Sequence, residues 1–153
     1  MIEQAVVLGP VLAKIGAVAC MTLSALGSSL GAGAGGSGAV GAWKKCLVQK
    51  KPAPFQLLVF AGAPLSQTIY GMILMFLIYG KAETAGANGL LYLWAGLFGG
   101  LAMGVSAWMQ GKAAAVACDS FAETGKGFTN DLMILGIIET CALFIMAFLI
   151  SVL

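Results

Sequence analysis

Residues 132–153 read LMILGIIETCALFIMAFLISVL, an apolar run that carries a single charged side chain, Glu139. A helix needs about 20 apolar residues to cross the hydrocarbon core of a bilayer. The run therefore predicts a membrane-spanning helix with one carboxylate inside it. Because an unpaired carboxylate is costly to bury in lipid, Glu139 also marks a candidate functional site.

The composition of the whole chain is that of a membrane protein. Of its 153 residues, 60% are hydrophobic and only 9% are charged, whereas about a quarter of the residues in an ordinary soluble domain are charged. The sequence contains no histidine and no arginine. It therefore lacks the commonest side-chain ligand of transition metals and the side chain that binds phosphate through two hydrogen bonds. The net charge of +2 gives no argument for binding nucleic acid.

Charged residues divide the chain into four apolar segments, each long enough to cross a membrane. We expect an all-α membrane protein with four transmembrane helices, at residues 15–43, 55–80, 89–111 and 132–153. The segment 44–54 carries four lysines, so the positive-inside rule places it in the cytoplasm. The predicted loop 112–131 then lies on the same side, and both termini lie outside.

The two halves of the chain resemble each other. A shift of 72 residues places Gln67-Thr68 over Glu139-Thr140, and four further apolar residues of the two segments also coincide. This match indicates one helical hairpin that has been duplicated, with residues 1–80 as the first transmembrane hairpin and residues 81–153 as the second. The second hairpin carries the carboxylate, and the first has the neutral Gln67 at the corresponding position.

The first apolar segment contains the glycine-rich stretch GSSLGAGAGGSGAVG at residues 27–41. Small residues recur there at a spacing of four, at Gly27, Gly31 and Gly35. Such a face lets two helix backbones approach closely in lipid, which favours a crowded inner position for this helix. Identical helices around a ring axis would need this pattern, and so would a simple tight bundle.

The polar residues of the predicted spans gather at one depth. Glu139 has no basic partner at a similar depth in the sequence, so it must carry a proton or hold a cation. Ser66, Gln67 and Gln110 supply neutral oxygens, and Pro64 disturbs its helix and frees a backbone carbonyl. One negative charge with several neutral oxygens suits a monovalent cation such as sodium better than a divalent one. A protonated acid that only holds two helices together stays open.

Several of these features occur together in one known family. They are the glycine-rich first segment, PLSQTIYG at residues 64–71, Gln110-Gly111-Lys112, and Glu139-Thr140. In this combination the chain resembles, over essentially its full length, the duplicated four-helix proteolipid, or c/K subunit, of V-type and V/A-type rotary ATPases. The resemblance is greatest to the sodium-translocating bacterial form, which implies an integral protein of the bacterial cell membrane.

The resemblance implies a role for each polar residue. The essential ion-binding glutamate of the family falls on Glu139. Serine stands at a position where threonine is usual in the family, and the hydroxyl is kept. The implied Na⁺ ligands, with H⁺ as the alternative cargo, are Glu139, Gln110, Gln67, Ser66 and the backbone carbonyl of Ala63. Tyr70, which would hydrogen-bond the glutamate, Thr140 and Pro64 are the implied supporting residues.

The resemblance also implies a function and partners. The chain would form a homo-oligomeric rotor ring in membrane lipid, turning against a stator membrane subunit that supplies an arginine. A central-stalk adaptor subunit would bind the cytoplasmic loops. The chain has no Walker motif, so we expect no catalytic site in it and ATP hydrolysis on another subunit. The alternatives are a small proton-relay transporter or channel subunit that uses Glu139 without an ATPase partner, and a purely structural packing protein.

Overall fold

A computed structural model describes the backbone of residues 2–153 and the side chains of residues 8–86 and 88–153. It has five α-helices: α1 (Ile2–Val48), α2 (Leu57–Gly62), α3 (Ser66–Lys81), α4 (Gly89–Thr124) and α5 (Phe128–Val152). A 3₁₀ turn at Ala63–Leu65 joins α2 to α3. The short turns Ala82–Thr84 and Gly86–Asn88 connect α3 to α4. Residues 2–153 contain no strand.

Four of the helical segments are long and apolar enough to cross a membrane. They are Leu8–Val48, Leu57–Thr84, Gly89–Thr124 and Phe128–Val152. The predicted all-α architecture of four membrane-spanning helices is confirmed, and the chain is an integral, multi-pass membrane protein. The proposed boundary between the two hairpins falls beside the end of α3. The duplication itself stays a prediction, and residue 1 lies outside the described residues.

The predicted loop at residues 112–131 is wrong. The helix that begins at Gly89 continues to Thr124, and only residues 125–127 separate it from α5. Charged residues do not end this helix, because they lie on its exposed side: the Lys45 Nζ is 3.4 Å from Asp119 Oδ1 and 3.5 Å from Glu123 Oε1. The helix is capped by Gly125, whose φ of 64° is left-handed, as at many helix C-termini.

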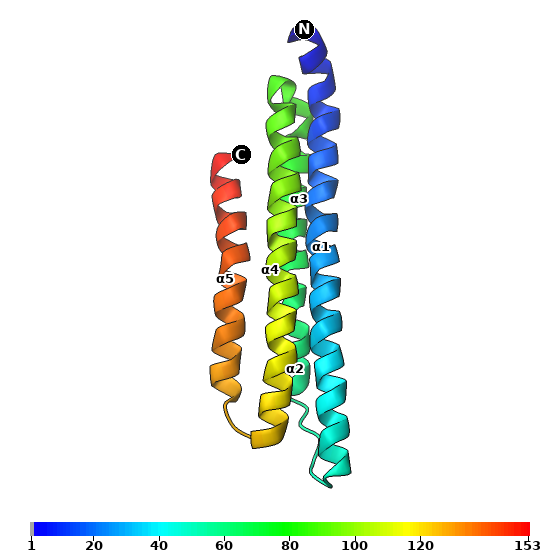
Figure 1. Ribbon diagram of the computed structural model, residues 1–153. Coiled ribbons are helices and arrows are strands. Elements are labelled where there is room, and N and C mark those ends of the chain that lie inside the picture. The colour runs from blue at the N-terminus through cyan, green and yellow to red at the C-terminus, as the bar shows by residue number, and fades with distance from the viewer. Residues whose placement is uncertain (1) are drawn as a thin grey trace.

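The lysine-rich segment is also more helical than predicted. The first helix runs to Val48, so within the segment 44–54 the chain leaves the helix only after that residue. The connecting segment is held to α1 by the indole N–H of Trp43, which donates to the carbonyl of Pro54 at 2.7 Å. Both connecting loops, 49–56 and 125–127, lie at the end of the bundle opposite to the two termini (Figure 1).

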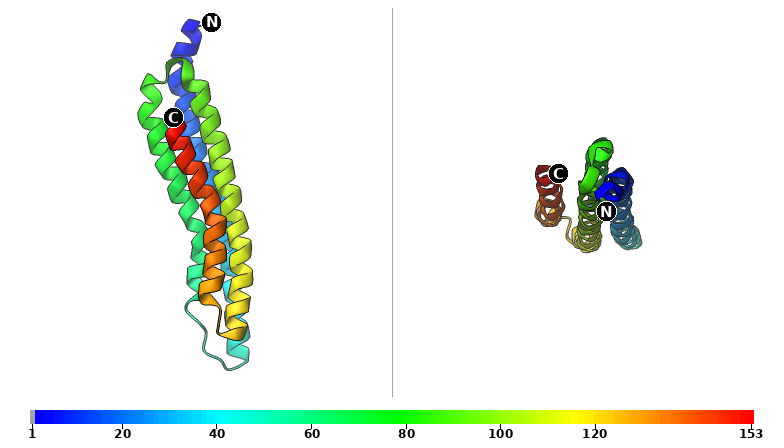
Figure 2. Two further views of the ribbon diagram at one scale, coloured as in Figure 1. Left: turned by 90° about the vertical axis from the view of Figure 1, so that its left-hand side faces the viewer. Right: turned by 90° about the horizontal axis from the view of Figure 1, so that it is seen from above.

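The helices lie in three layers. Helices α1 and α4 run side by side, α3 packs against both, and α5 stands on the other side of α3 and α4 from α1 (Figures 1 and 2). The carboxyl-terminal helix is therefore the least covered, and it exposes Ile137, Phe144 and Phe148 by 61% or more. In a membrane protein such surfaces face lipid or a neighbouring subunit.

Glycines bring α1 and α4 into backbone contact. A Cβ added to Gly96 or Gly111 of α4 would collide with the backbone of α1, and one added to Gly27 of α1 would collide with the backbone of α4. Close approach of this kind lets two helices gain dispersion contacts in lipid, where no hydrophobic driving force pulls them together. The glycine-rich stretch therefore serves the predicted close packing, with α4 as its partner.

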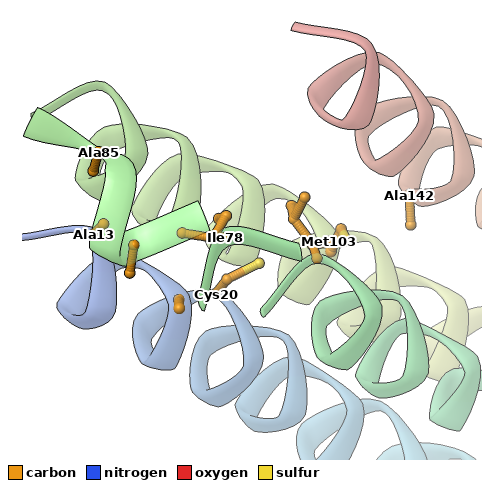
Figure 3. Close-up of a cluster of buried hydrophobic side chains, with 9 residues drawn as sticks. Ala13, Cys20, Ile78, Ala85, Met103 and Ala142 are labelled. Atoms are coloured by element: carbon orange, nitrogen blue, oxygen red, sulfur yellow. The ribbon is translucent and has the colours of Figure 1, made fainter. Parts of the chain in front are cut away.

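Two apolar clusters fill the bundle at different heights. The first takes Cys20, Ile78, Met103 and Ala142 from four different helices, and each of them is fully buried (Figure 3). The second lies toward the connecting loops, where the Phe60 ring is 6.2 Å from that of Phe121 and 5.1 Å from that of Phe128 between centroids. Polar side chains of α3, α4 and α5 occupy the level between these clusters.

Candidate ion-binding site

The second membrane span is interrupted beside the polar residues. Pro64 has no N–H group and cannot continue the α-helical hydrogen-bond pattern, and the chain forms a 3₁₀ turn at Ala63–Leu65 before α3 begins at Ser66. The carbonyl of Ala63 accepts from the backbone N–H of Ser66, and also from its hydroxyl at 3.1 Å. The break therefore places a carbonyl and a hydroxyl oxygen next to each other.

A continuous chain of hydrogen bonds leads from this turn to the carboxylate. The single hydroxyl proton of Ser66 is shared between the Ala63 carbonyl and Gln67 Oε1, which lies 3.2 Å from Ser66 Oγ, and Gln67 Nε2 donates to Gln110 Oε1 at 2.8 Å. Gln110 Nε2 then donates to Glu139 Oε2 at 3.2 Å and to the carbonyl of Leu135 at 3.0 Å. Both glutamine side chains are fully buried, so three helices join through them in the interior.

Both oxygens of Glu139 accept hydrogen bonds. The Tyr70 hydroxyl donates to Oε1, and the Gln110 amide donates to Oε2. The carboxyl group itself is partly buried at the inner side of α5. Donors on both oxygens fix the position of the group.

No cationic side chain in the described part of the chain pairs with this carboxylate. Among residues 8–86 and 88–153, the ion pairs join Lys14 to Glu83 and Lys45 to two acidic residues of α4, and none includes Glu139. The positive charge that would neutralise Glu139 must therefore come from outside these side chains. A proton or a bound cation would supply it.

The polar level lies nearer to the middle of the helices than we predicted. The predicted span begins at residue 132, which would place Glu139 about 10 Å from its start at 1.5 Å per residue. Because α5 begins at Phe128, the distance along the helix axis is about 17 Å at 1.5 Å per residue. Gln110 also lies well inside its helix, since α4 continues to Thr124. The site is therefore far from both ends of the bundle.

The predicted site residues are brought together, with one exception. Glu139, Gln110, Gln67, Ser66, Tyr70 and the Ala63 carbonyl are linked by the hydrogen bonds given above, and Pro64 is buried in the turn beside them. Thr140 is exposed, and its hydroxyl donates to the carbonyl of Ile137 in its own helix at 2.6 Å. It makes no hydrogen bond to the other predicted residues.

Two groups that hold α5 at the site were not predicted from the sequence. The Ser106 hydroxyl donates to the carbonyl of Ile138 at 2.9 Å, and the carbonyl of Leu135 accepts from Gln110. Ser106 lies one helical turn before Gln110, so the two residues share a face of the helix. This spacing of four could have indicated that Ser106 belongs to the site. The role of Leu135 left no signal, because any residue offers a backbone carbonyl.

The donor set fits a hard monovalent cation. Glu139, Gln110, Gln67, Ser66 and Ala63 all carry oxygen atoms and belong to one hydrogen-bonded group, and only one of them is a carboxylate. Within the described part of the chain, no three His, Cys, Asp or Glu side chains come together. A divalent ion prefers more negative charge than this group offers.

The comparison with known families covers less than half of the chain, at its carboxyl-terminal end. Residues 93–153 match the family model of the ATP synthase c subunit. This range includes Gln110, Ser106 and Glu139, but not the residues of α2 and α3. A search of curated proteins found no match. In its α4–α5 hairpin, which carries the carboxylate of the site, the chain is therefore similar to the c subunits of ATP synthases.

Proposed function

We propose that the chain is a subunit of the homo-oligomeric rotor ring of a V-type ATPase, and that it carries Na⁺ at Glu139 during ATP-driven rotation. The observation that carries the proposal is the hydrogen-bonded chain from Ser66 to Glu139 within apolar membrane spans. The family match of residues 93–153 supports the rotor assignment. The arrangement of four spans that share one site carboxylate, which the predicted duplication of a hairpin would produce, supports the V-type form.

The surface of the chain supports assembly with further copies. Gly33, Gly36 and Gly41 of α1 have no atom within 4 Å of the position that a Cβ would take. The packing of this chain alone therefore does not require glycine at these three positions. Neighbouring copies around a ring would use them as α4 uses Gly27, for close approach between backbones.

The charge on the carboxylate couples rotation to transport in this proposal. A Glu139 that holds Na⁺ is neutral and can pass through lipid, whereas an empty one is charged and must face water or the arginine of a stator subunit. Moving one elementary charge across 100 mV is worth about 2.3 kcal/mol, which each step must supply or release. ATP hydrolysis takes place on another subunit, and an adaptor subunit binds the loops 49–56 and 125–127 on the cytoplasmic side.

Carbodiimide labelling tests the ion site directly. The reagent is added to the detergent-solubilised oligomer at a series of pH values, with sodium, with potassium and with neither, and the label on Glu139 is measured by mass spectrometry. We expect millimolar sodium to protect Glu139 and potassium not to do so. Exposed Glu123 is an internal control whose reactivity sodium should leave unchanged, and Glu139→Gln should take no label at that position.

The same experiment separates the alternatives. Labelling that depends on pH alone would favour H⁺ as the cargo. The mass of the native oligomer then distinguishes a rotor ring from a small proton-relay transporter, because a ring contains many copies and resists mild detergent. Absence of labelling under all conditions would contradict an ion-carrying role and favour a carboxyl group that only holds helices together.

A further inference from the structure

One buried hydroxyl in α1 has no hydrogen-bond partner. Ser28 is 1% exposed, and its Oγ bonds to nothing within the described residues. Three other serines of the same helix, Ser24, Ser29 and Ser37, donate to the carbonyl four residues earlier at 2.8 to 2.9 Å. A buried polar group without a partner is costly. The orphaned hydroxyl of Ser28 therefore needs an explanation.

The helix register places Ser28 opposite Gln67. A Cβ on Gly71 would lie 2.5 Å from Ser24 Oγ, and one on Gly31 would lie 2.8 Å from the Cβ of Pro64. Helices α1 and α3 are antiparallel, so four residues forward from Ser24 correspond to four residues back from Gly71 (Figure 1). Both contacts give the same register, and Ser28 then lies at the level of the fully buried Gln67.

The amide of Gln67 cannot keep its present partners and also bind a cation with its neighbour. Its nitrogen points to Gln110 Oε1, and its oxygen points away to Ser66. An amide carries oxygen and nitrogen on opposite sides of one carbon. Both glutamine oxygens can therefore face the same ion only when Gln67 turns its nitrogen away from Gln110. The buried N–H group then needs a new acceptor.

We propose that Ser28 is a positioning residue of the ion site, whose hydroxyl oxygen accepts the Gln67 amide N–H in the ion-loaded state. The hydroxyl holds the rotated amide so that Gln67 Oε1 points at the cation. In the hydrogen-bond network described above Gln67 donates to Gln110, and Ser28 Oγ is the buried acceptor that a rotated amide would reach. This inference rests on the proposed function, because it requires a cation that binds both amide oxygens.

The test is the concentration of sodium that gives half-maximal protection of Glu139 from carbodiimide in the intact oligomer. We expect Ser28→Ala to raise this concentration about tenfold, because a buried amide N–H without an acceptor opposes the loaded state. Ser28→Cys, which keeps a weak acceptor of similar shape, should give a smaller increase. Ser29→Ala is the matched control, since Ser29 is exposed and its hydroxyl is satisfied by Ala25.

A second measurement distinguishes a specific effect on the orientation of the Gln67 amide from a general disturbance of the site. The pH profile of labelling without sodium should be the same in Ser28→Ala and the wild type, because the proposed bond from Gln67 to Ser28 forms only when a cation binds. A half-protection concentration equal to that of the wild type would overturn the inference, and so would a shifted sodium-free profile. If sodium fails to protect even the wild type, the sodium proposal itself is wrong and the role of Ser28 falls with it.

Discussion

The contact between α1 and α4 gives a prediction whose size follows from the structure. A Cβ on Gly100 would lie 2.6 Å from the carbonyl oxygen of Cys20 and 2.8 Å from its Cα, whereas ordinary contact begins at 3.4 Å. Gly100→Ala must therefore move the two backbones apart by about 0.6–0.8 Å, and such a gap forfeits a quarter or more of each neighbouring dispersion contact. Overpacking of this kind costs about 1–3 kcal/mol.

Gly33→Ala is the matched control for this change. Gly33 lies in the middle of α1, and a Cβ there would meet no atom within 4 Å. Both substitutions gain the higher helix propensity of alanine, so this contribution cancels in their difference. We expect Gly100→Ala to be less stable than Gly33→Ala by about 1–3 kcal/mol.

The assay is reversible unfolding of the dispersed single chain in mixed micelles, with increasing denaturing detergent and helical circular dichroism as the signal. The single chain is used so that any contact of Gly33 with a neighbouring copy does not enter. A difference within about 0.5 kcal/mol, the usual size of an effect away from special features, would refute the close backbone contact between α1 and α4.

Three further changes probe the site and the loop. Ser106→Ala should loosen α5 by about 0.5–1.5 kcal/mol through loss of the bond to Ile138, measured as faster amide hydrogen exchange in α5 than in α4; equal exchange in variant and wild type would contradict this. Trp43→Phe should increase proteolytic cleavage of the loop 49–56 through loss of the bond to Pro54, while sodium protection stays unchanged; an unaltered cleavage rate would show that this bond does not hold the loop. Tyr70→Phe should weaken sodium protection about tenfold or more, because the carboxylate loses the donor that fixes it; unchanged protection would show that this hydroxyl does not position the carboxylate.

Much of the site could be predicted from the sequence because lipid makes polar residues informative. Glu139, Gln110 and Gln67 stand out in apolar segments, and each lies in the hydrogen-bonded group that the structure describes. The groups that were not predicted act through contacts that the residue type alone does not reveal. The Leu135 carbonyl and the unpartnered Ser28 hydroxyl become recognisable only when neighbouring helices are in place.

The helix ends were predicted less well, for a related reason. Charges indicate where a chain leaves the apolar phase, but they do not indicate where a helix ends. Two helices continue beyond the predicted apolar segments, α1 through Lys45 and α4 through Asp119 and Glu123. The lysine pairs with both carboxylates across these two helices. The end of α4 is instead set by the left-handed backbone at Gly125, which a glycine allows.

Four membrane crossings and one carboxylate inside them can be read directly from the order of residues along this chain. Backbone groups in lipid must bond within their own helix, so apolar length alone specifies the spans. Which helices meet, by contrast, follows only from their packing in three dimensions. The register of α1 against α4, the position of α5 on the far side of α3, and the order of donors around Glu139 depend on side-chain shape across helices distant in sequence. Hydropathy carries no information about that shape.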